Sequence, residues 1–421
     1  DLLHFEKILV TSHCTLGAQK LRGASRAFLT AFTPAENESE RAKSLCLTTE
    51  QSAALQHLNR VIEEILKLEN KETPLVLRNK LHDIQELLPL FLRRDTTFVR
   101  YVECRRENGI LSTDLCAVPF DLPQCVYDAL WREQKPAILT SGTLDTGEDF
   151  THAKHRLGLD RGTPLRTLRI LSPFRYDENC LLYFPEPQHT KPPYKQDEDR
   201  VAHQIQELIN TANGHTLVLF TSYDQMGRVY EKLKNKFPVP VLQVQRNPQV
   251  YLERFKQLPN AVLFASGACW EGVDFPGDMV SLLIIVKLPF KVPDPLGEAL
   301  RKQYRNLHSY IQAEVVPEMQ IKLRQGFGRA IRTESDSCVV AVLDPRAAPG
   351  KRYRQAVLDA LPKMPISDKL TDIQSFLQSK KNPSYFEPRF PKEVDYHAGN
   401  LFHSGSQKQR SHHAAADSDL P

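Results

Sequence analysis

The segment Gln325–Arg332, with the sequence QGFGRAIR, combines two arginines and a glutamine at spacings typical of one helical face. Arg329 and Arg332 are three residues apart and Gln325 precedes Arg329 by four, so a helix would present all three side chains together. Gly328 would allow another stretch of backbone to approach closely. Two guanidinium groups directed at one point suit a phosphoryl group that gains negative charge during transfer. The alternative is a solvated helix whose arginines form ion pairs.

Other candidate ligand-binding segments each follow a short apolar run that is typical of a buried strand. Ala137–Leu139 leads into Thr140–Leu144 (TSGTL), Leu217–Phe220 leads into Thr221–Tyr223 (TSY), and Ala261–Phe264 leads into Ala265–Asp278. In open α/β sheets, ligands bind at the carboxyl ends of the strands. Loops rich in glycine and hydroxyl side chains expose hydrogen-bond donors to phosphates. The sequence therefore predicts an α/β protein with a phosphate-binding edge.

In order and spacing, these strings resemble the XPD/DinG-like superfamily 2 DNA helicases, and more closely the bacterial DinG branch. The resemblance covers roughly residues 96–360. TSGTL at 140–144 is similar to motif III, LFTSY at 219–223 to motif IV, WEGVDFPG at 270–277 to motif V and QGFGRAIR at 325–332 to motif VI. KLPF at 287–290, with PDP at 293–295, is also similar to the DinG branch. Any one string is weak, but four in this order are specific.

The resemblance implies two motor lobes that close on one ATP molecule. Arg329 and Arg332 would act as arginine fingers, and Gln325 would orient the attacking water or the phosphate. Asp274 would accept a hydrogen bond from a ribose hydroxyl and Glu271 would order its loop, with loop capping by these carboxylates as the alternative. The positions expected at the nucleotide are Gly142, Thr143, Glu271, Gly272, Asp274 and Gly328.

For DNA, the resemblance places Ser222 and Tyr223 where motif IV meets the strand. Tyr223 and Trp270 are candidate surfaces on which single-stranded bases would stack, although core packing is the favoured alternative for Trp270. Ser141 and Thr143 would couple the nucleotide state to DNA movement, unless Thr143 only caps a helix. Single-stranded DNA is therefore the expected partner, and 5′-to-3′ movement is implied by the resemblance alone.

Two motifs of such motors are absent from the sequence. There is no G-x-x-x-x-G-K-[ST] phosphate loop and no Asp-Glu-Ala-His box. The family places both, and in many members an iron–sulfur cluster, before the TSGTL segment. We therefore expect the C-terminal part of a longer helicase, inactive alone, with ATP and Mg²⁺ held mainly by the other part. The alternatives are a non-catalytic, nucleic-acid-binding remnant of a motor lobe and, less favoured, an enzyme for small nucleotides.

Composition narrows the class of protein further. The eight cysteines form no C-x-x-C pair, which argues against a zinc ribbon, a disulfide framework or any metal site within this chain. A formal net charge of +4 permits a nucleic-acid partner without requiring one. The sequence has no apolar run long enough for a membrane span and no secretory signal at its start. We expect a cytoplasmic monomer.

The periodicity of apolar residues predicts the order of helices and strands along the chain. We expect two helices within residues 45–94, broken at Lys71–Pro74, strands within 96–124, a helix over 197–212, and strands over 216–220, 239–244, 261–265, 281–286 and 337–343. This alternation indicates a largely parallel sheet covered on both faces. With the resemblance, the domains are a helical arch-like segment (1–95), the C-terminal part of a first RecA-like domain (96–164), a second RecA-like domain (165–365) and a C-terminal extension (366–421), largely disordered from about residue 378.

Overall fold

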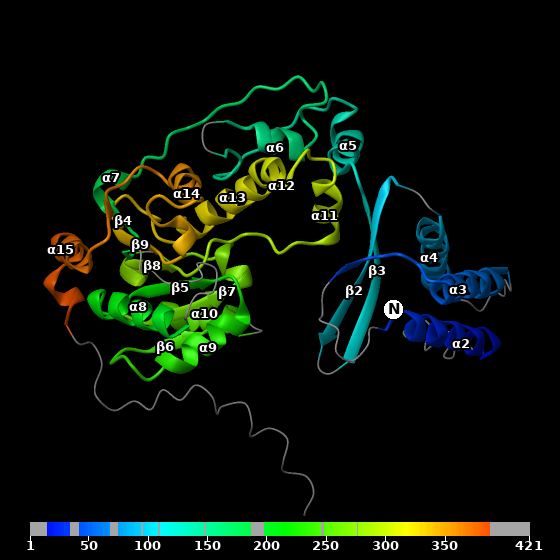
Figure 1. The fold of residues 1–421 in the computed structure, drawn as a ribbon, viewed down its shortest axis with the longest axis horizontal. Coiled ribbons are helices and arrows are strands. Elements are labelled where there is room, and N and C mark those ends of the chain that lie inside the picture. The colour runs from blue at the N-terminus through cyan, green and yellow to red at the C-terminus, as the bar shows by residue number, and fades with distance from the viewer. Residues whose placement is uncertain are drawn as a thin grey trace, which may run out of the picture. The chain divides into compact units, whose positions relative to one another are not determined.

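A computed structural model describes residues 15–33, 42–67, 75–93, 96–107, 110–146, 149–186, 198–245, 248–275 and 277–387. The chain divides into two compact units (Figure 1). Unit 1 comprises Asp1–Ile170 and Phe290–Ile321, and unit 2 comprises Leu171–Pro289 and Lys322–Pro421. The insertion of Phe290–Ile321 into unit 1 was not expected from the sequence.

Unit 2 is built on a seven-stranded sheet in the order β10-β4-β9-β8-β5-β7-β6. Every neighbouring pair is parallel, which confirms the predicted α/β class. The strands are β4 Cys180–Tyr183, β5 Thr216–Phe220, β6 Val241–Gln243, β7 Val262–Ser266, β8 Leu282–Ile285, β9 Cys338–Val342 and β10 Ile366–Ser367. The five strands predicted for this region are all present, whereas β4 and β10 were not predicted.

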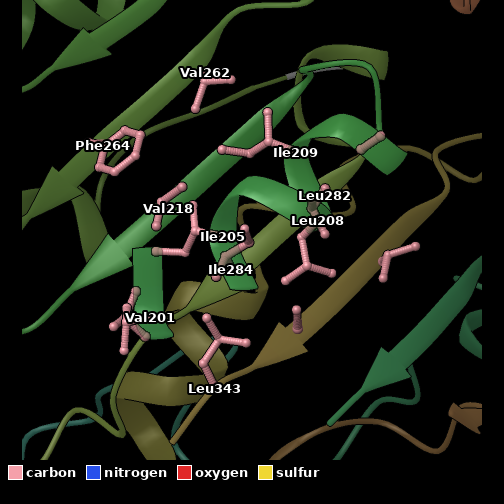
Figure 2. Packing of buried hydrophobic residues seen from close by; sticks show 14 of the residues in the cluster. Val201, Ile205, Leu208, Ile209, Val218, Val262, Phe264, Leu282, Ile284 and Leu343 are labelled. Carbon is pink, nitrogen blue, oxygen red and sulfur yellow. The ribbon is translucent and has the colours of Figure 1, made fainter. Parts of the chain in front are cut away.

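The core of unit 2 explains why its strands read as continuous apolar runs. Strands buried on both faces have no solvent side, so polar alternation disappears. On one face, Val201, Ile205 and Leu208 of α8 (Glu198–Thr211) pack over Val218 of β5 and Ile284 of β8 (Figure 2). These side chains are at most 1% exposed, and each contributes about 1.5–3 kcal/mol by burial.

Helices cover both faces of this sheet. α9 (Tyr223–Leu233) and α15 (Leu370–Lys380) join α8 on the first face. Leu219 alternates with Val218 along β5, and its Cδ1 lies 3.2 Å from where a Cβ on Gly326 of α13 (Val316–Phe327) would sit. The part of α13 from Lys322 onward, which belongs to unit 2, therefore packs on the opposite face, beside α14 (Arg354–Ala360). α10 (Pro248–Gln257) also belongs to the sheet region.

Unit 1 contains a helical cluster and an antiparallel sheet. Its helices α2 (Thr15–Phe32), α3 (Thr49–Lys67) and α4 (Leu75–Leu92) share one hydrophobic core. The two helices predicted within 45–94 are thus confirmed, and their expected break at Lys71–Pro74 lies outside the described residues. β2 (Phe98–Glu107) and β3 (Ile110–Pro119) form a hairpin that packs on this core through Val102, Leu115 and Ala117, and β1 (Lys43–Ser44) pairs with β2.

The rest of unit 1 consists of short helical segments. They are α5 Leu122–Val126, η1 Tyr127–Trp131, α6 Thr151–Arg156, α11 Pro295–Arg301, α12 Leu307–Tyr310 and η4 Ile311–Val315. The strand predicted at Ala137–Leu139 is wrong, because this segment forms no strand and Ile138 is 94% exposed. A strand requires a neighbour for its backbone hydrogen bonds, and no described strand pairs with this segment. The assignment of 96–164 to a RecA-like domain stays a prediction.

The predicted disorder from about residue 378 is wrong as far as the structure is described. α15 continues to Lys380, and Tyr385 in the short helix η6 (Pro383–Tyr385) is only 3% exposed. The Tyr385 hydroxyl donates to the Ala212 carbonyl oxygen at 2.8 Å. Isolated apolar residues in a polar stretch can thus dock without a periodic pattern. The polar tail beyond residue 387 lies outside the described residues. Among the described helices, none combines the length and the apolarity needed to cross a bilayer.

Candidate functional site

The two arginines of the QGFGRAIR segment converge on one main-chain oxygen. The Arg329 Nη1 donates to the carbonyl oxygen of Val273, and the Arg332 Nη2 donates to the same oxygen at 2.7 Å. Arg329 is further fixed by its Nε, which donates to the Gln325 carbonyl oxygen at 3.2 Å. The predicted convergence of the guanidinium groups is therefore present in unit 2.

The geometry that produces this convergence differs from the predicted one. α13 ends at Phe327, and Gly328–Ala330 form a turn, so Arg329 and Arg332 are not on a continuous helical face. Only the Val273 carbonyl, contributed by a loop more than fifty residues upstream, brings the two side chains to one point. The prediction of a shared helix face is wrong for these arginines, because α13 terminates before it reaches them.

Asp274 lies next to the shared carbonyl and forms an ion pair with Arg332. Its Oδ1 is 2.8 Å from the Arg332 Nε, and the Asp274 side chain is 67% exposed. The pKa of Arg329 is lowered on balance, mainly by burial and next by the charge of Arg332. The charges of Asp274 and Glu271 partly oppose this shift. Arginine nevertheless stays protonated in proteins. Two positive charges thus face one exposed carboxylate, and exposed pairs of this kind contribute at most about 1 kcal/mol. A phosphate oxygen can compete for such guanidinium groups.

The loop that supplies Val273 and Asp274 depends on glycine at two positions. β7 ends at Ser266 and continues into η2 (Gly267–Trp270). Gly267 has φ +62° and Gly272 has φ +69°, values that favour glycine over any residue with a Cβ. Glu271 is exposed beside Gly272. The backbone turn, rather than a contact made by the glycines themselves, places the Val273 carbonyl toward the arginines.

Trp270 is a core residue in this structure. Its ring is 1% exposed, and its Nε1 donates to the Phe220 carbonyl oxygen at 2.9 Å. A Cβ on Gly326 would lie 2.8 Å from the Trp270 Cε3, so the indole rests directly on α13. The prediction that Trp270 stacks on a base is therefore wrong. The close approach that was expected at Gly328 occurs at Gly326, since the nearest atom to a Cβ on Gly328 is the Gln325 carbonyl oxygen, at 3.3 Å.

The residues predicted to contact DNA behave differently from one another. Ser222 is the N-cap of α9, and its Oγ accepts from the Gln225 amide at 3.4 Å. Its hydroxyl is thus engaged in the fold. Tyr223 is 55% exposed, and its ring covers Gly267 at the carboxyl edge shared by β5 and β7. Tyr223 therefore keeps a face on which a base could stack.

Gly142 and Thr143 belong to unit 1 and lie in an exposed turn. The Ser141 Oγ accepts from the Thr143 amide at 3.2 Å, and the two hydroxyl oxygens are 3.3 Å apart. Ser141 therefore closes this turn, and Thr143 caps no described helix. The nucleotide-contact role of Gly142 and Thr143 stays a prediction.

Two parts of the site were missed from the sequence. The first is the Val273 carbonyl, which no side-chain pattern reveals. The second is Asp336, which is 5% exposed and accepts at 2.8 Å from the amides of both Arg332 and Thr333. The Thr333 hydroxyl also donates to the Asp336 Oδ1 at 2.7 Å. The spacing Thr-x-x-Asp after Arg332 was a usable signal, because such pairs commonly close loops on their own backbone.

The described cysteines do not fit an iron–sulfur cluster. Such clusters take four ligands, whereas the described residues contain no group of three or more potential metal-binding side chains. Cys180 and Cys338 are neighbours on β4 and β9, but both are 0% exposed. Burial raises the pKa of the Cys180 thiol to about 12. These thiols are part of the hydrophobic core.

Comparison with known proteins gives this geometry a family context. The family described as "Helicase C-terminal domain" matches residues 205–364, which include β5–β9 and both arginines. The "3'-5' exonuclease DinG" of Bacillus subtilis is 31% identical over 318 residues, covering 71% of this chain and 33% of the relative. The "ATP-dependent DNA helicase YoaA" of Haemophilus influenzae is 36% identical over 252 residues, covering 58% and 38%.

A solved structure of an XPD helicase has a similar fold. The TM-score is 0.52 at 16% sequence identity, over 87% of this chain and 64% of that chain. The chain spans 33% and 38% of the lengths of the two relatives above. The matched range 205–364 contains both convergent arginines and the Val273–Asp274 loop. Residues 205–364 therefore match the helicase C-terminal domain family, and the chain is similar in sequence to DinG and YoaA.

Proposed function

We propose that this chain supplies the second motor lobe of a DinG-like, ATP-dependent DNA helicase. The observation that carries the proposal is the convergence of Arg329 and Arg332 on the Val273 carbonyl, with Asp274 alongside. A lobe that only held its fold would not need two guanidinium groups at one weakly paired, exposed carboxylate. The named activity of the Haemophilus influenzae relative supports this choice.

In this proposal, the arginines act on the terminal phosphate of ATP. The Arg332 guanidinium would leave Asp274 and bind the γ-phosphate oxygens. The Arg329 guanidinium would leave the Val273 carbonyl oxygen and bind them as well. Fixed positive charge of this kind stabilises the negative charge that spreads over the transferred phosphoryl group. Gln325 would orient the attacking water, and Gly142 and Thr143 stay candidate nucleotide contacts. The sequence holds no phosphate-loop motif, so the β-phosphate and Mg²⁺ would be held mainly by a first motor lobe.

The test uses the complete helicase that contains this chain. Arg329→Ala and Arg332→Ala should each lower DNA-stimulated ATPase by on the order of a thousandfold, because arginine fingers contribute that much to turnover. Arg→Lys should also fail, since a point charge does not reproduce the planar fork. DNA affinity should stay close to wild type.

Arg228→Ala is the matched control, because Arg228 lies in the same unit but pairs with Glu198 on α9 and α8. It should keep wild-type turnover. Wild-type ATPase in Arg329→Ala or Arg332→Ala would return the segment to an ion-pair role and would favour the non-catalytic nucleic-acid-binding remnant.

Single-stranded DNA is the proposed track, and Tyr223 is the proposed stacking residue. Its exposed ring at the carboxyl edge of β5 supports this role. Tyr223→Ala should weaken binding of an oligonucleotide by about 1–3 kcal/mol, the range for one stacked base. Tyr223→Phe should bind normally, because it keeps the ring. Affinity should fall with salt as phosphate contacts release counterions. Equal affinity of the alanine and phenylalanine variants would remove Tyr223 from the DNA site.

A further inference from the structure

The loop that follows Arg332 is held from outside by the end of α15. This 333–337 loop (residues 333–337) connects the arginine segment to β9, which begins at Cys338. Two of its carbonyl oxygens, those of Glu334 and Ser337, accept hydrogen bonds from side chains distant in the sequence. Lys381 donates the bond to Ser337 directly, whereas the bond to Glu334 is donated by a side chain that Lys380 contacts in turn.

Lys381 makes the direct connection. Its side chain is 2% exposed, and its Nζ donates to the Ser337 carbonyl oxygen at 2.8 Å. The same Nζ lies 2.5 Å from the Oδ1 of Asp278, in the short helix η3 (Gly277–Val280) before β8. A buried ammonium with a carboxylate and a carbonyl as acceptors is costly to disturb, because removing either acceptor leaves charge unpaired. Lys381 therefore ties Ser337 to the start of β8.

Lys380 makes a second connection through Asn179, at the end of α7 (Tyr176–Asn179). The Lys380 Nζ donates to the Asn179 Oδ1 at 3.2 Å, and the Asn179 Nδ2 donates to the Glu334 carbonyl oxygen at 3.0 Å. The lysine thereby fixes which way the amide faces. Glu334 and Ser337 are thus held at two points of the same loop.

Hydrogen bonds within the 333–337 loop transmit this constraint to Arg332. Asp336, which directly precedes Ser337, accepts from the backbone amides of Arg332 and Thr333, both at 2.8 Å. A shift of Ser337 would move Asp336 and, with it, the backbone from which the Arg332 side chain extends. Since the Arg332 Nη2 reaches Val273 at 2.7 Å, a small displacement would change that contact.

The element that carries the lysines is itself firmly attached. Ile373 and Leu377 of α15 are fully buried in the core of unit 2. Beyond the lysines, the Tyr385 ring stacks on His215 with ring centroids 4.1 Å apart. The Asn213 Nδ2 donates to the Tyr385 carbonyl oxygen at 2.9 Å. The lysines are therefore fixed on both sides.

We propose that Lys380 and Lys381 are positioning residues for the Arg332 finger, an inference that rests on the proposed function. They act through Asn179, Ser337 and Asp336 and touch neither nucleotide nor DNA. Residues that hold a catalytic group in place through other residues can strongly affect the reaction rate, because a displacement of about 1 Å can cost on the order of a hundredfold in rate.

The experiment combines amide hydrogen exchange with steady-state kinetics on the complete helicase. The variants are Lys381→Met, which keeps the volume of the side chain, Lys380→Met at an exposed position, and Arg332→Ala. Lys369→Met is the control, because Lys369 is exposed at the start of the same helix. Lys380→Met keeps the test informative if Lys381→Met fails to fold.

We expect the lysine variants to exchange the Arg332 and Thr333 amides about tenfold faster or more, while the amides of β5 stay protected. In the same variants, kcat should fall on the order of ten- to a hundredfold, with KM for ATP within about threefold of wild type. Lys369→Met should match wild type in both measurements.

Unchanged exchange at Arg332 and Thr333, or a uniform rise throughout unit 2, would overturn the proposal, because the lysines would then have no local effect. Faster loop exchange with wild-type kcat in the lysine variants and lost turnover in Arg332→Ala would overturn the positioning role alone. Full turnover in Arg332→Ala would instead overturn the proposed function, and the positioning role with it. The two failures are therefore distinguishable.

Discussion

Two motif segments with the same kind of sequence adopt different structures in this protein. Ala137–Leu139 and Leu217–Phe220 are both short apolar runs followed by threonine and serine. The second run lies in β5, where its four side chains are all 0% exposed. In the first run, Ile138 is 94% exposed and no strand forms.

Neighbouring backbone makes the difference. β5 lies between β7 and β8 and pairs with both, so its amides and carbonyls are bonded on two sides. Leu217–Phe220 also receives side chains of α8 on one face and Leu219 receives α13 on the other. Ala137–Leu139 has no described strand beside it. An apolar run therefore indicates the capacity to form a buried strand, and its neighbours decide whether that capacity is used.

The largest expected effect follows from placing a charge in each run. Val218→Asp buries an unpaired carboxylate between α8 and the sheet and should lower the free energy of unfolding of unit 2 by about 4 kcal/mol or more. Ile138→Asp should change it by no more than about 0.5 kcal/mol, because the side chain is already in solvent. Urea denaturation of the two variants measures the contrast. Similar destabilisation by both would mean that Ile138 is buried in solution.

Thiol reactivity gives a second contrast between the units. Cys125 in α5 of unit 1 is exposed, whereas Cys180 in β4 is fully buried with its pKa raised to about 12. At pH 8 such a thiol holds roughly a thousandth or less of the thiolate of an ordinary cysteine, whose pKa is about 8.5. Iodoacetamide should label Cys125 first and Cys180 only after unfolding. Equal labelling rates in the native chain, read by mass spectrometry, would contradict the burial of β4.

Two motif glycines sharpen the comparison at smaller magnitude. Gly326→Ala puts a methyl group 2.8 Å from the Trp270 Cε3, whereas a Cβ on Gly142 meets nothing within 4 Å. Overpacking of this kind costs about 1–3 kcal/mol, and the helical preference for alanine returns about 1 kcal/mol of it. We therefore expect a net loss for Gly326→Ala and a change within about 0.5 kcal/mol for Gly142→Ala. A stabilised Gly326→Ala variant would mean that the indole can move away.

The smallest effect concerns the serines that follow the two runs. Ser222→Ala removes the N-cap of α9 and should lower the free energy of unfolding by about 1 kcal/mol. Ser141→Ala opens an exposed turn only and should have no measurable effect. Thermal melts of both variants are sufficient to compare them. A larger loss for Ser141→Ala would assign that turn a structural role.

The linear pattern of residues was sufficient to predict the parallel α/β character of unit 2 and the order of its chemical motifs. Its strands are continuous apolar runs because both faces are buried, and runs such as Thr216–Phe220 were located to the residue. The pair Arg329 and Arg332 was singled out by residue type and spacing, while the role expected for it rested on the resemblance of the neighbouring motifs. These features are local in the chain, and therefore a linear pattern can show them.

The groups that those residues contact became apparent only in the folded chain. The Val273 carbonyl collects both guanidinium groups although α13 ends before them, and burial converts Trp270 from a candidate stacking surface into core. Likewise, Lys381 and Tyr385 lie in a stretch without apolar periodicity, yet they fasten the starts of three strands of the sheet. Main-chain acceptors and single docked side chains leave no periodic trace in a sequence, because their partners are set by distances in the folded chain.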